Sequence, residues 1–193
     1  LRGSSVRIVG GTLRGKKLFT PQSESIRPTT DRVRETIFNI LAHNSEIGRI
    51  LKPETRALDA YAGSGALGIE ALSRGVGHVT FSDLNTTLLL ENLKACNLEK
   101  WSSVLKGDAA TLPFQGPYDL IFLDPPYGKG LIEKTLKNLW DQNAVSQNAI
   151  FICEFQKDET IQWPENLTLI TERTISISKI LFLKVNALPS HGK

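Results

Sequence analysis

Hydrophobic and polar positions along this chain follow two spacings, one typical of buried strands and the other of amphipathic helices. Short apolar runs predict five strands, at residues 57–60, 79–82, 104–106, 118–123 and 149–154. Between them, apolar residues at helical spacing predict three helices, at residues 66–74, 86–96 and 131–140. Because such alternation is typical of βαβ units, we expect a mostly parallel sheet with helices on both faces.

The C-terminal part of the chain departs from this alternation. Residues 167–171 and 175–185 are two β-prone runs with little helical pattern between them. We expect these runs to form an antiparallel pair at one edge of the sheet. The pattern as a whole predicts an α/β fold built on a seven-stranded sheet.

The N-terminal part holds one short hairpin and one helix before the alternation begins. Residues 6–9 and 13–19 are β-prone and flank a Gly-Gly pair, which favours a β-hairpin. A helix is predicted from Val33 to Leu41, because its apolar positions follow helical spacing and residues 28–31 can cap it.

Length and composition fit one soluble domain with a small extension. The chain has 193 residues, 40% hydrophobic and 22% charged, and no apolar run approaches the roughly 20 residues of a membrane span. We therefore expect a monomer without a membrane segment, divided into an N-terminal extension (residues 1–26) and one α/β domain (residues 27–193). No basic and apolar leader opens the chain, so we expect it to be cytoplasmic.

The cysteines and histidines do not have the spacing of a metal site. Cys96 and Cys153 lie far apart among apolar neighbours, and the three histidines share no ligand spacing with them. We expect two buried thiols and no bound metal.

Positive charge is concentrated before residue 36. Residues 1–35 carry eight Lys or Arg and three Asp or Glu, a net charge of +5, whereas the remainder carries −2. Such a segment is typical of a surface that contacts nucleic-acid phosphates, although an ordinary solvated face has the same composition. The candidate RNA contacts are Arg7, Arg14, Lys16, Lys17, Arg27, Arg32 and Arg34.

A glycine-rich turn joins the first strand of the alternating region to the helix that follows. Gly63, Gly65 and Gly68 permit close backbone approach, and the helix N-terminus offers amide donors to a ligand. This spacing fits both a dinucleotide and S-adenosylmethionine. Asp59 favours S-adenosylmethionine, because a carboxylate there would repel a pyrophosphate and attract the methionyl ammonium group. Asp59 could instead accept hydrogen bonds from the loop amides.

Further acidic residues follow the next strands. Asp83 can accept hydrogen bonds from ribose hydroxyls, and Asp108 lies where an acceptor would meet an adenine amino group, unless residues 107–109 form only a turn. Ligands of open α/β sheets gather at the carboxyl ends of parallel strands. The predicted cofactor site comprises Asp59, Ala60, Gly63, Ser64, Gly65, Asp83, Leu84, Asp108 and Ala109.

The apolar strand at residues 118–123 is followed directly by Asp124-Pro125-Pro126-Tyr127. Two prolines stiffen the backbone and remove amide donors, so the turn is rigid and rich in acceptors. A carboxylate before them and an aromatic ring after them suit a planar exocyclic amine on a stacked base. A proline pair can also do no more than end a strand. These four residues are the candidate catalytic residues.

Together these motifs resemble class I S-adenosylmethionine-dependent methyltransferases, which are Rossmann-like, and among them the RsmD family of 16S ribosomal RNA guanine-N2 methyltransferases. The resemblance rests on residues 7–11, 14–18, 27–36, 59–72 and 124–127, of which 27–36 is the most family-specific block. Residues 172–185 depart from the family pattern, which has a glycine shortly before the last strand and more aromatic residues within it.

The resemblance implies a substrate and a mechanism. The protein would bind 16S ribosomal RNA or the assembling small ribosomal subunit, methylate the exocyclic amine of one guanine and release S-adenosylhomocysteine. Asp124 and the Pro125 carbonyl would accept the two amine protons, while Tyr127 stacks on the base.

Other functions are compatible with parts of the same pattern. A DNA adenine-N6 methyltransferase would use the same tetrapeptide, but 193 residues leave little room for a separate target-recognition domain. A glutamine-N5 protein methyltransferase usually has asparagine at the position of Asp124. The glycine turn alone also permits an NAD-dependent oxidoreductase. A protein that binds RNA without catalysis, as in ribosome assembly, could retain the fold.

Overall fold

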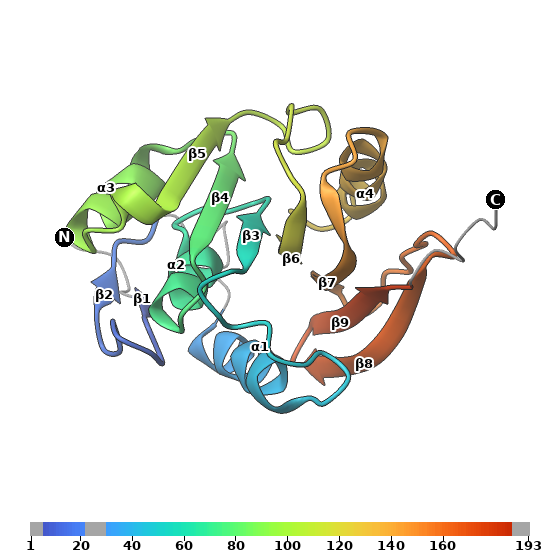
Figure 1. The fold of residues 1–193 in the computed structure, drawn as a ribbon, viewed down its shortest axis with the longest axis horizontal. Helices are drawn as coiled ribbons and strands as arrows, with labels where there is room; N and C mark the ends of the chain where they lie inside the picture. The colour runs from blue at the N-terminus through green and yellow to red at the C-terminus, as the bar shows by residue number, and fades with distance from the viewer. Residues whose placement is uncertain (1–5, 22–29, 187–193) are drawn as a thin grey trace.

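The structure is a computed structural model that describes residues 6–21 and 30–186. A seven-stranded sheet runs through it in the order β5-β4-β3-β6-β7-β9-β8 (Figure 1). Its strands are β3 (Arg56–Asp59), β4 (His78–Asp83), β5 (Ser102–Lys106), β6 (Tyr118–Leu123), β7 (Val145–Gln156), β8 (Leu167–Ile175) and β9 (Ser178–Val185). The helices are α1 (Asp31–His43), α2 (Ala66–Ser73), α3 (Thr87–Ala95), α4 (Leu131–Asp141) and the short 3-10 helix η1 (Glu99–Trp101). A separate hairpin pairs β1 (Val6–Arg7) with β2 (Lys17–Leu18).

Strand pairing confirms the predicted fold class. All neighbouring pairs from β5 through β7 are parallel. The last strand, β9, runs antiparallel to both β7 and β8. Because β3, β4, β5 and β6 are parallel neighbours, their carboxyl ends lie at one edge of the sheet.

Two hydrophobic cores cover the two faces of this sheet. Alternate residues of β6 divide between them, with Leu120 and Phe122 in the first core and Ile121 and Leu123 in the second. Helices α1, α2 and α3 contribute their apolar residues to the first core, and α4 contributes its own to the second. The cysteines are buried and free, as predicted.

The turn before the last strand explains how this chain folds without the expected glycine. Ile175 pairs with Ser178, so a two-residue turn joins β8 to β9. Ser176 adopts the left-handed conformation there, with φ 58°. A non-glycine residue pays a modest energetic cost for this backbone geometry, and the sheet pairing on both sides holds it in place.

The N-terminal hairpin is held against α2 by one buried carboxylate. Glu70 is completely buried and accepts hydrogen bonds from the backbone amides of Val9 and Gly10, both at 2.8 Å. Arg74 donates to the same carboxylate from Nε at 2.7 Å. Apolar side chains of the hairpin also belong to the first core. The position of the hairpin relative to α2 is therefore defined by buried polar and apolar contacts.

Candidate active site

Four aspartates gather at the carboxyl ends of adjacent parallel strands. Asp59 is the last residue of β3 and Asp83 the last residue of β4. Asp108 lies two residues after β5, and Asp124 directly follows β6. These strands are neighbours in the order β5-β4-β3-β6. The predicted convergence of acidic strand ends is therefore present in the fold.

Asp59 lies between the others in the strand order and is almost completely buried. Its side chain is only 2% exposed, and its Oδ2 accepts a hydrogen bond from the Gly68 amide at 2.9 Å. Burial raises the pKa of Asp59 from 3.8 to about 7; the Gly68 amide opposes this rise, while the negative charges of Asp124 and Asp83 add to it. A cationic ligand next to Asp59 would relieve the repulsion among these carboxylates.

Gly63 and Gly65 of the turn and Gly68 of α2 have different steric surroundings. A Cβ at Gly65 would lie 2.6 Å from Leu89 Cδ1, and one at Gly68 would lie 2.2 Å from Phe81 Cε1. By contrast, a Cβ at Gly63 would meet no atom within 4 Å. Gly65 and Gly68 thus allow the turn and α2 to pack closely on the fold, whereas Gly63 presents bare backbone to open space. That open backbone fits a ligand that lies against the turn.

Asp83 connects the glycine turn to the end of β4. Its Oδ2 accepts from the Gly63 amide at 2.8 Å, and its Oδ1 accepts from the Asn85 amide at 3.0 Å. Each carboxylate oxygen can accept more than one hydrogen bond, so these contacts leave capacity for two ribose hydroxyls. Leu84, which follows, is 71% exposed. An apolar side chain held at this edge suits contact with a flat ring.

The structure places Asp108 in a local turn. Its Oδ1 accepts from the Ala110 amide at 2.9 Å, and its backbone oxygen accepts from Thr111. Ala109 is buried, and its carbonyl accepts a hydrogen bond from Asn138 Nδ2 at 2.9 Å. A turn at Asp108, which the sequence analysis allowed as an alternative, is thus present. The Asp108 side chain remains exposed in this turn.

Ala60 and Ser64, two other predicted cofactor residues, use backbone groups in hydrogen bonds within the fold. The Ala60 amide donates to Phe122, and its carbonyl accepts from the Ser82 hydroxyl at 2.8 Å. Ser64 is 8% exposed, and its carbonyl accepts from Asn92 Nδ2 at 2.8 Å. Both residues therefore hold the shape of the turn.

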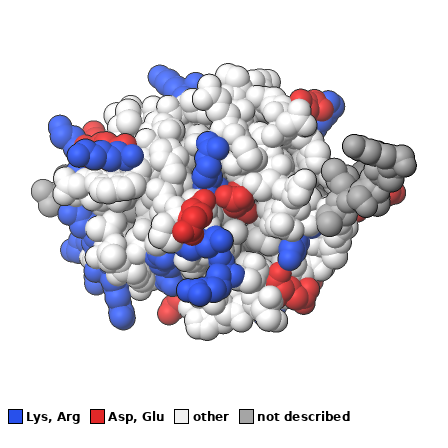
Figure 2. Space-filling model, in the orientation of Figure 1, with Lys and Arg blue, Asp and Glu red and all other residues white. Residues whose placement is uncertain are grey.

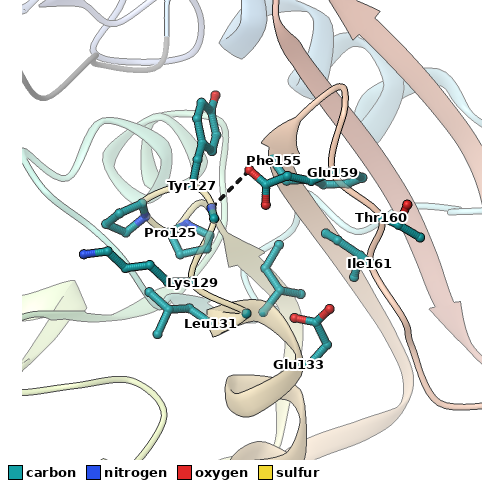
Figure 3. Close-up of a pocket in the computed structure, with 13 residues that line it drawn as sticks. Pro125, Tyr127, Lys129, Leu131, Glu133, Phe155, Glu159, Thr160 and Ile161 are labelled. Carbon is teal, nitrogen blue, oxygen red and sulfur yellow. Dashed lines mark hydrogen bonds between the residues drawn. The ribbon is translucent and has the colours of Figure 1, made fainter.

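The tetrapeptide after β6 is fixed by contacts from the C-terminal half of the sheet. Tyr127 shares a hydrogen bond with Ser178, the first residue of β9, at 3.1 Å between the two hydroxyl oxygens. The next amide, of Gly128, donates to Glu159 Oε1 at 3.1 Å (Figure 3). Ser178 is buried, so the antiparallel edge of the sheet helps to set the orientation of the Tyr127 ring. The sequence offered no signal for this contact.

A cavity of about 160 Å³ opens beside the tetrapeptide. One wall is the segment from Pro125 to Glu133, and the other comes from Phe155 and residues 159–161. Figure 3 shows Lys129 and Leu131 on the first wall and Glu159, Thr160 and Ile161 on the second. Pro125 is buried and Pro126 exposed, so the stiff turn forms part of the molecular surface at this cavity.

Tyr61 is a residue of this site that sequence reasoning missed. It lies in the glycine turn, and its hydroxyl is 2.5 Å from the Thr135 hydroxyl and 3.3 Å from the Leu131 carbonyl, both in α4. Burial raises the pKa of Tyr61, with a smaller contribution in the same direction from Asp108. Tyr61 thus ties the turn to the helix that follows the tetrapeptide. An aromatic residue between Asp59 and Gly63 was the available signal.

The candidate RNA contacts separate into three groups. Arg7, Arg14, Lys16 and Lys17 of the hairpin and Arg32 of α1 are exposed. Figure 2 shows Lys and Arg side chains gathered at the left edge of the molecule, in the region of the hairpin and α3. Arg27 lies outside the described residues.

Arg34 does not belong to this basic surface. Its side chain is completely buried, and its Nη2 donates to the Arg7 carbonyl and to Asp31 Oδ1, both at 2.6 Å. The prediction of a phosphate contact was wrong for this arginine, because its charged group is used inside the fold. It connects the start of α1 to the hairpin.

The turn of the hairpin lies far from the tetrapeptide. The amides of Thr12 and Leu13 donate to Ser73, the last residue of α2, at 2.8 and 2.9 Å. Helix α2 starts at the glycine turn, and eight residues span about 12 Å. Arg14 is therefore at the opposite end of α2 from the acidic edge, while β2 leads back toward that edge.

No group of three or more His, Cys, Asp or Glu side chains in residues 6–21 and 30–186 is arranged to hold a metal ion. No helix within these residues is long and apolar enough to cross a membrane.

Comparison with known proteins gives concordant matches along nearly the whole chain. A family model described as conserved hypothetical protein 95 matches residues 6–184. A Haemophilus influenzae protein named ribosomal RNA small subunit methyltransferase D is 40% identical over 183 residues, covering 89% of this chain and 90% of its own. The Escherichia coli (strain K12) protein of the same name is 36% identical over 173 residues, covering 87% and 84%.

Solved structures agree with this result. A methyltransferase from Escherichia coli superposes with a TM-score of 0.81 at 34% identity, covering 96% of this chain and 100% of that one. A methylase from Haemophilus influenzae superposes with a TM-score of 0.75 at 34% identity, covering 95% and 99%.

Proposed function

This chain belongs to the RsmD family of ribosomal RNA methyltransferases, and from that membership we propose that it methylates the exocyclic N2 amine of a guanine in 16S ribosomal RNA. The observation that carries the proposal is the meeting of Asp59, Asp83 and Asp124 at one sheet edge, beside the open backbone of Gly63. This edge combines a place for a cationic cofactor with acceptors for an amine. The alternatives of a dinucleotide oxidoreductase and a DNA methyltransferase lack comparable support.

S-Adenosylmethionine would supply an electrophilic methyl group on a sulfonium centre. Asp83 would hold the two ribose hydroxyls while keeping the Gly63 amide in place, and Leu84 would cover one face of the adenine. Asp108 would accept from the adenine amino group. Asp59 would lie on the methionyl side, where its charge complements an ammonium group. The acidic lining supports this cofactor over one with a pyrophosphate.

The tetrapeptide would prepare the guanine amine for attack. Its nitrogen is a weak nucleophile because the lone pair is delocalised into the ring. If Asp124 and the Pro125 carbonyl accept its two protons, the nitrogen is drawn toward tetrahedral geometry and its lone pair is aimed at the methyl group. The rigid proline backbone keeps both acceptors fixed. Tyr127, oriented by Ser178, would stack on the base.

The RNA would lie along the side of the molecule that carries the hairpin. Chemistry on a base requires an unstacked nucleotide, so other contacts must hold the strand around it. Arg7, Lys16 and Lys17 would grip phosphates on the way to the acidic edge, and Arg14 would reach phosphates farther along. The N-terminal extension (residues 1–26) is thus proposed as an RNA-contact element on a monomeric catalytic domain, acting on naked RNA or on the assembling small subunit.

Cofactor affinity should depend on pH through Asp59. Since its pKa is raised to about 7, the carboxylate is largely protonated at pH 6 and ionised at pH 8. A cationic ligand binds the ionised form better, so S-adenosylmethionine affinity should rise with pH, by up to about tenfold per unit below the pKa. Calorimetric titration at pH 6, 7 and 8 measures this directly.

The Asp59→Asn variant is the control for this pH dependence. It keeps an oxygen that can accept from Gly68 but removes the charge, so its affinity should be low and nearly constant between pH 6 and 8. A wild-type dissociation constant that does not change over this range would contradict the role of Asp59.

Replacing Arg14, Lys16 and Lys17 together by glutamine should weaken RNA binding. Affinity falls as salt rises, and each lost phosphate contact makes the slope of log affinity against log salt less steep by about 1. The magnitude of the slope should therefore decrease by about 2 to 3. Filter binding at several salt concentrations measures the slope. A matched variant that replaces Lys134, Lys137 and Lys157, which are exposed elsewhere, should retain it. Equal slopes for wild type and the hairpin variant would refute the contacts.

A further inference from the structure

Phe19 has an exposed ring on an unusually well fixed backbone. Its side chain is 50% exposed. Its amide donates to Asn92 Oδ1 at 2.8 Å, and its carbonyl accepts from Asn92 Nδ2 at 2.9 Å. Single exposed apolar residues are common and need no explanation. An exposed ring whose two backbone groups are both held by a buried side chain is a different case, because its position is defined before any partner arrives.

Asn92 also connects this ring to the cofactor turn. The residue lies in α3 and is completely buried. The same Nδ2 atom that donates to Phe19 donates to the Ser64 carbonyl at 2.8 Å. The carbonyl oxygens of Phe19 and Ser64 are therefore no more than two hydrogen-bond lengths apart. The backbone of Phe19 lies next to the glycine turn, at the end of the hairpin that approaches the acidic edge.

The residues before Phe19 carry positive charge. Lys16 and Lys17 are exposed, and Lys17 pairs with Arg7 in the hairpin. An aromatic ring that follows exposed cations is the arrangement by which proteins hold single-stranded nucleic acid, with phosphates on the cations and a base on the ring. A surface for a protein partner would not call for this density of charge.

We propose that Phe19 stacks on an RNA base that flanks the target nucleotide, and that Asn92 is the positioning residue that holds this ring in register with the cofactor turn. The inference rests on the proposed function, since it names a further contact with the same RNA. It assigns two residues that take no part in the chemistry of methyl transfer.

The fixed backbone gives this contact its physical advantage. Stacking a base on a mobile aromatic side chain costs the conformational entropy of ordering the segment, whereas here the backbone of Phe19 is already held by two hydrogen bonds to Asn92. Because Asn92 also donates to the Ser64 carbonyl in the cofactor turn, a base stacked on Phe19 is also placed at a defined distance from the methyl donor. The contact thus contributes to affinity and to the alignment of the strand.

Phe19→Leu tests the stacking contact, because leucine keeps an apolar side chain but has no ring face. The variant should weaken binding of a ribosomal RNA fragment by about tenfold or more, with an unchanged salt slope because no cation is lost. Phe19→Trp should restore affinity to within about twofold of wild type. Trp101→Leu is the matched control: Trp101 is 49% exposed but lies just before β5, away from the acidic edge, and its loss should leave RNA binding unchanged.

Asn92→Asp tests the positioning role, because it turns the donor that faces two carbonyls into an acceptor. It should raise the KM for RNA, and the double variant with Phe19→Leu should lose little more than Asn92→Asp alone. Glu70→Gln is the control variant for Asn92→Asp. It weakens the contact between the hairpin and α2 but changes no hydrogen bond to Ser64 or Phe19, so the affinity for S-adenosylmethionine should be unchanged.

The outcomes separate this inference from the proposed function. Transfer of radiolabelled methyl to ribosomal RNA by the wild-type protein tests the function itself. If wild type is active and Phe19→Leu binds RNA as tightly as wild type, or if Phe19→Trp fails to restore binding, the stacking contact is refuted. Equal losses in Phe19→Leu and Trp101→Leu would likewise overturn it. Unchanged S-adenosylmethionine affinity in Phe19→Leu shows that the fold is intact.

Discussion

Replacing Asp124 by alanine should lower the single-turnover rate of methyl transfer by about two orders of magnitude or more. The carboxylate is proposed to accept an amine proton in the transition state, and removing one such fixed contact typically costs this much. Asp124 follows β6 at the edge of the site and contributes to the raised pKa of Asp59, whereas the Gly63 amide of the glycine turn is held by Asp83. The dissociation constant for S-adenosylmethionine should therefore change little. Rapid-quench kinetics with a labelled methyl group measure the rate.

Two further variants sharpen the test of Asp124. Asp124→Asn keeps an acceptor oxygen without the charge, so its rate should lie between those of wild type and Asp124→Ala. Asp141→Ala removes an exposed carboxylate of α4 that pairs only with Lys137 among the contacts described, and its rate should match wild type. A near-normal rate for Asp124→Ala at saturating cofactor would show that this residue does not hold the amine.

Asp83→Ala should affect binding instead of the rate, raising the dissociation constant for S-adenosylmethionine by about 100-fold or more. Hydrogen bonds to a charged group contribute about 1.5–3 kcal/mol each, and two to the ribose are proposed. The variant also releases the Gly63 amide, so the turn loses a contact that shapes it. At saturating cofactor, turnover should stay within a few-fold of wild type. Calorimetric titration with S-adenosylmethionine and S-adenosylhomocysteine measures the affinity.

The control for Asp83 separates ribose contacts from loop geometry. Asp83→Asn can still accept from Gly63 through its amide oxygen, but it has one acceptor fewer and no charge. Its affinity should fall between those of wild type and Asp83→Ala. If Asp83→Ala binds S-adenosylmethionine with wild-type affinity, the cofactor lies elsewhere at this edge, and the assignment of Asp108 and Leu84 to the adenine fails with it.

The periodic pattern of the sequence predicted the elements of the sheet correctly, and the reason is local. Apolar runs such as residues 118–123 must be buried on both faces, and helices between them must cover those faces, so spacing alone indicates the α/β class. Boundaries were less accurate. Strand β7 extends over Val145–Gln156, well beyond the predicted residues 149–154. Polar residues 146–148 lie at an irregularity in the pairing with β6, and Gln156 pairs with Ser178, so neither extension carries an apolar signal.

Residue types near the strand ends also identified most of the candidate site. Glycines, prolines and carboxylates have strong local signatures, and parallel strands bring their carboxyl ends together whatever the details of packing. Asp59, Asp83 and Asp124 could therefore be grouped before their positions were known. The same reasoning failed for Arg34, because a buried arginine and an exposed one have the same composition signal, and only packing distinguishes them.

The sequence by itself determined the fold class, the acidic edge and the stiff tetrapeptide, since each depends on chain-local chemistry or on the order of strands. Only the tertiary structure decided which distant groups meet there. Glu70 and Asn92 are polar residues in largely apolar helices, and their partners lie about 60 and 70 residues away along the chain. Such contacts are specified by the packing of the hairpin on α2 and α3, which no local pattern encodes. Through them the basic hairpin acquires a fixed position relative to the cofactor turn.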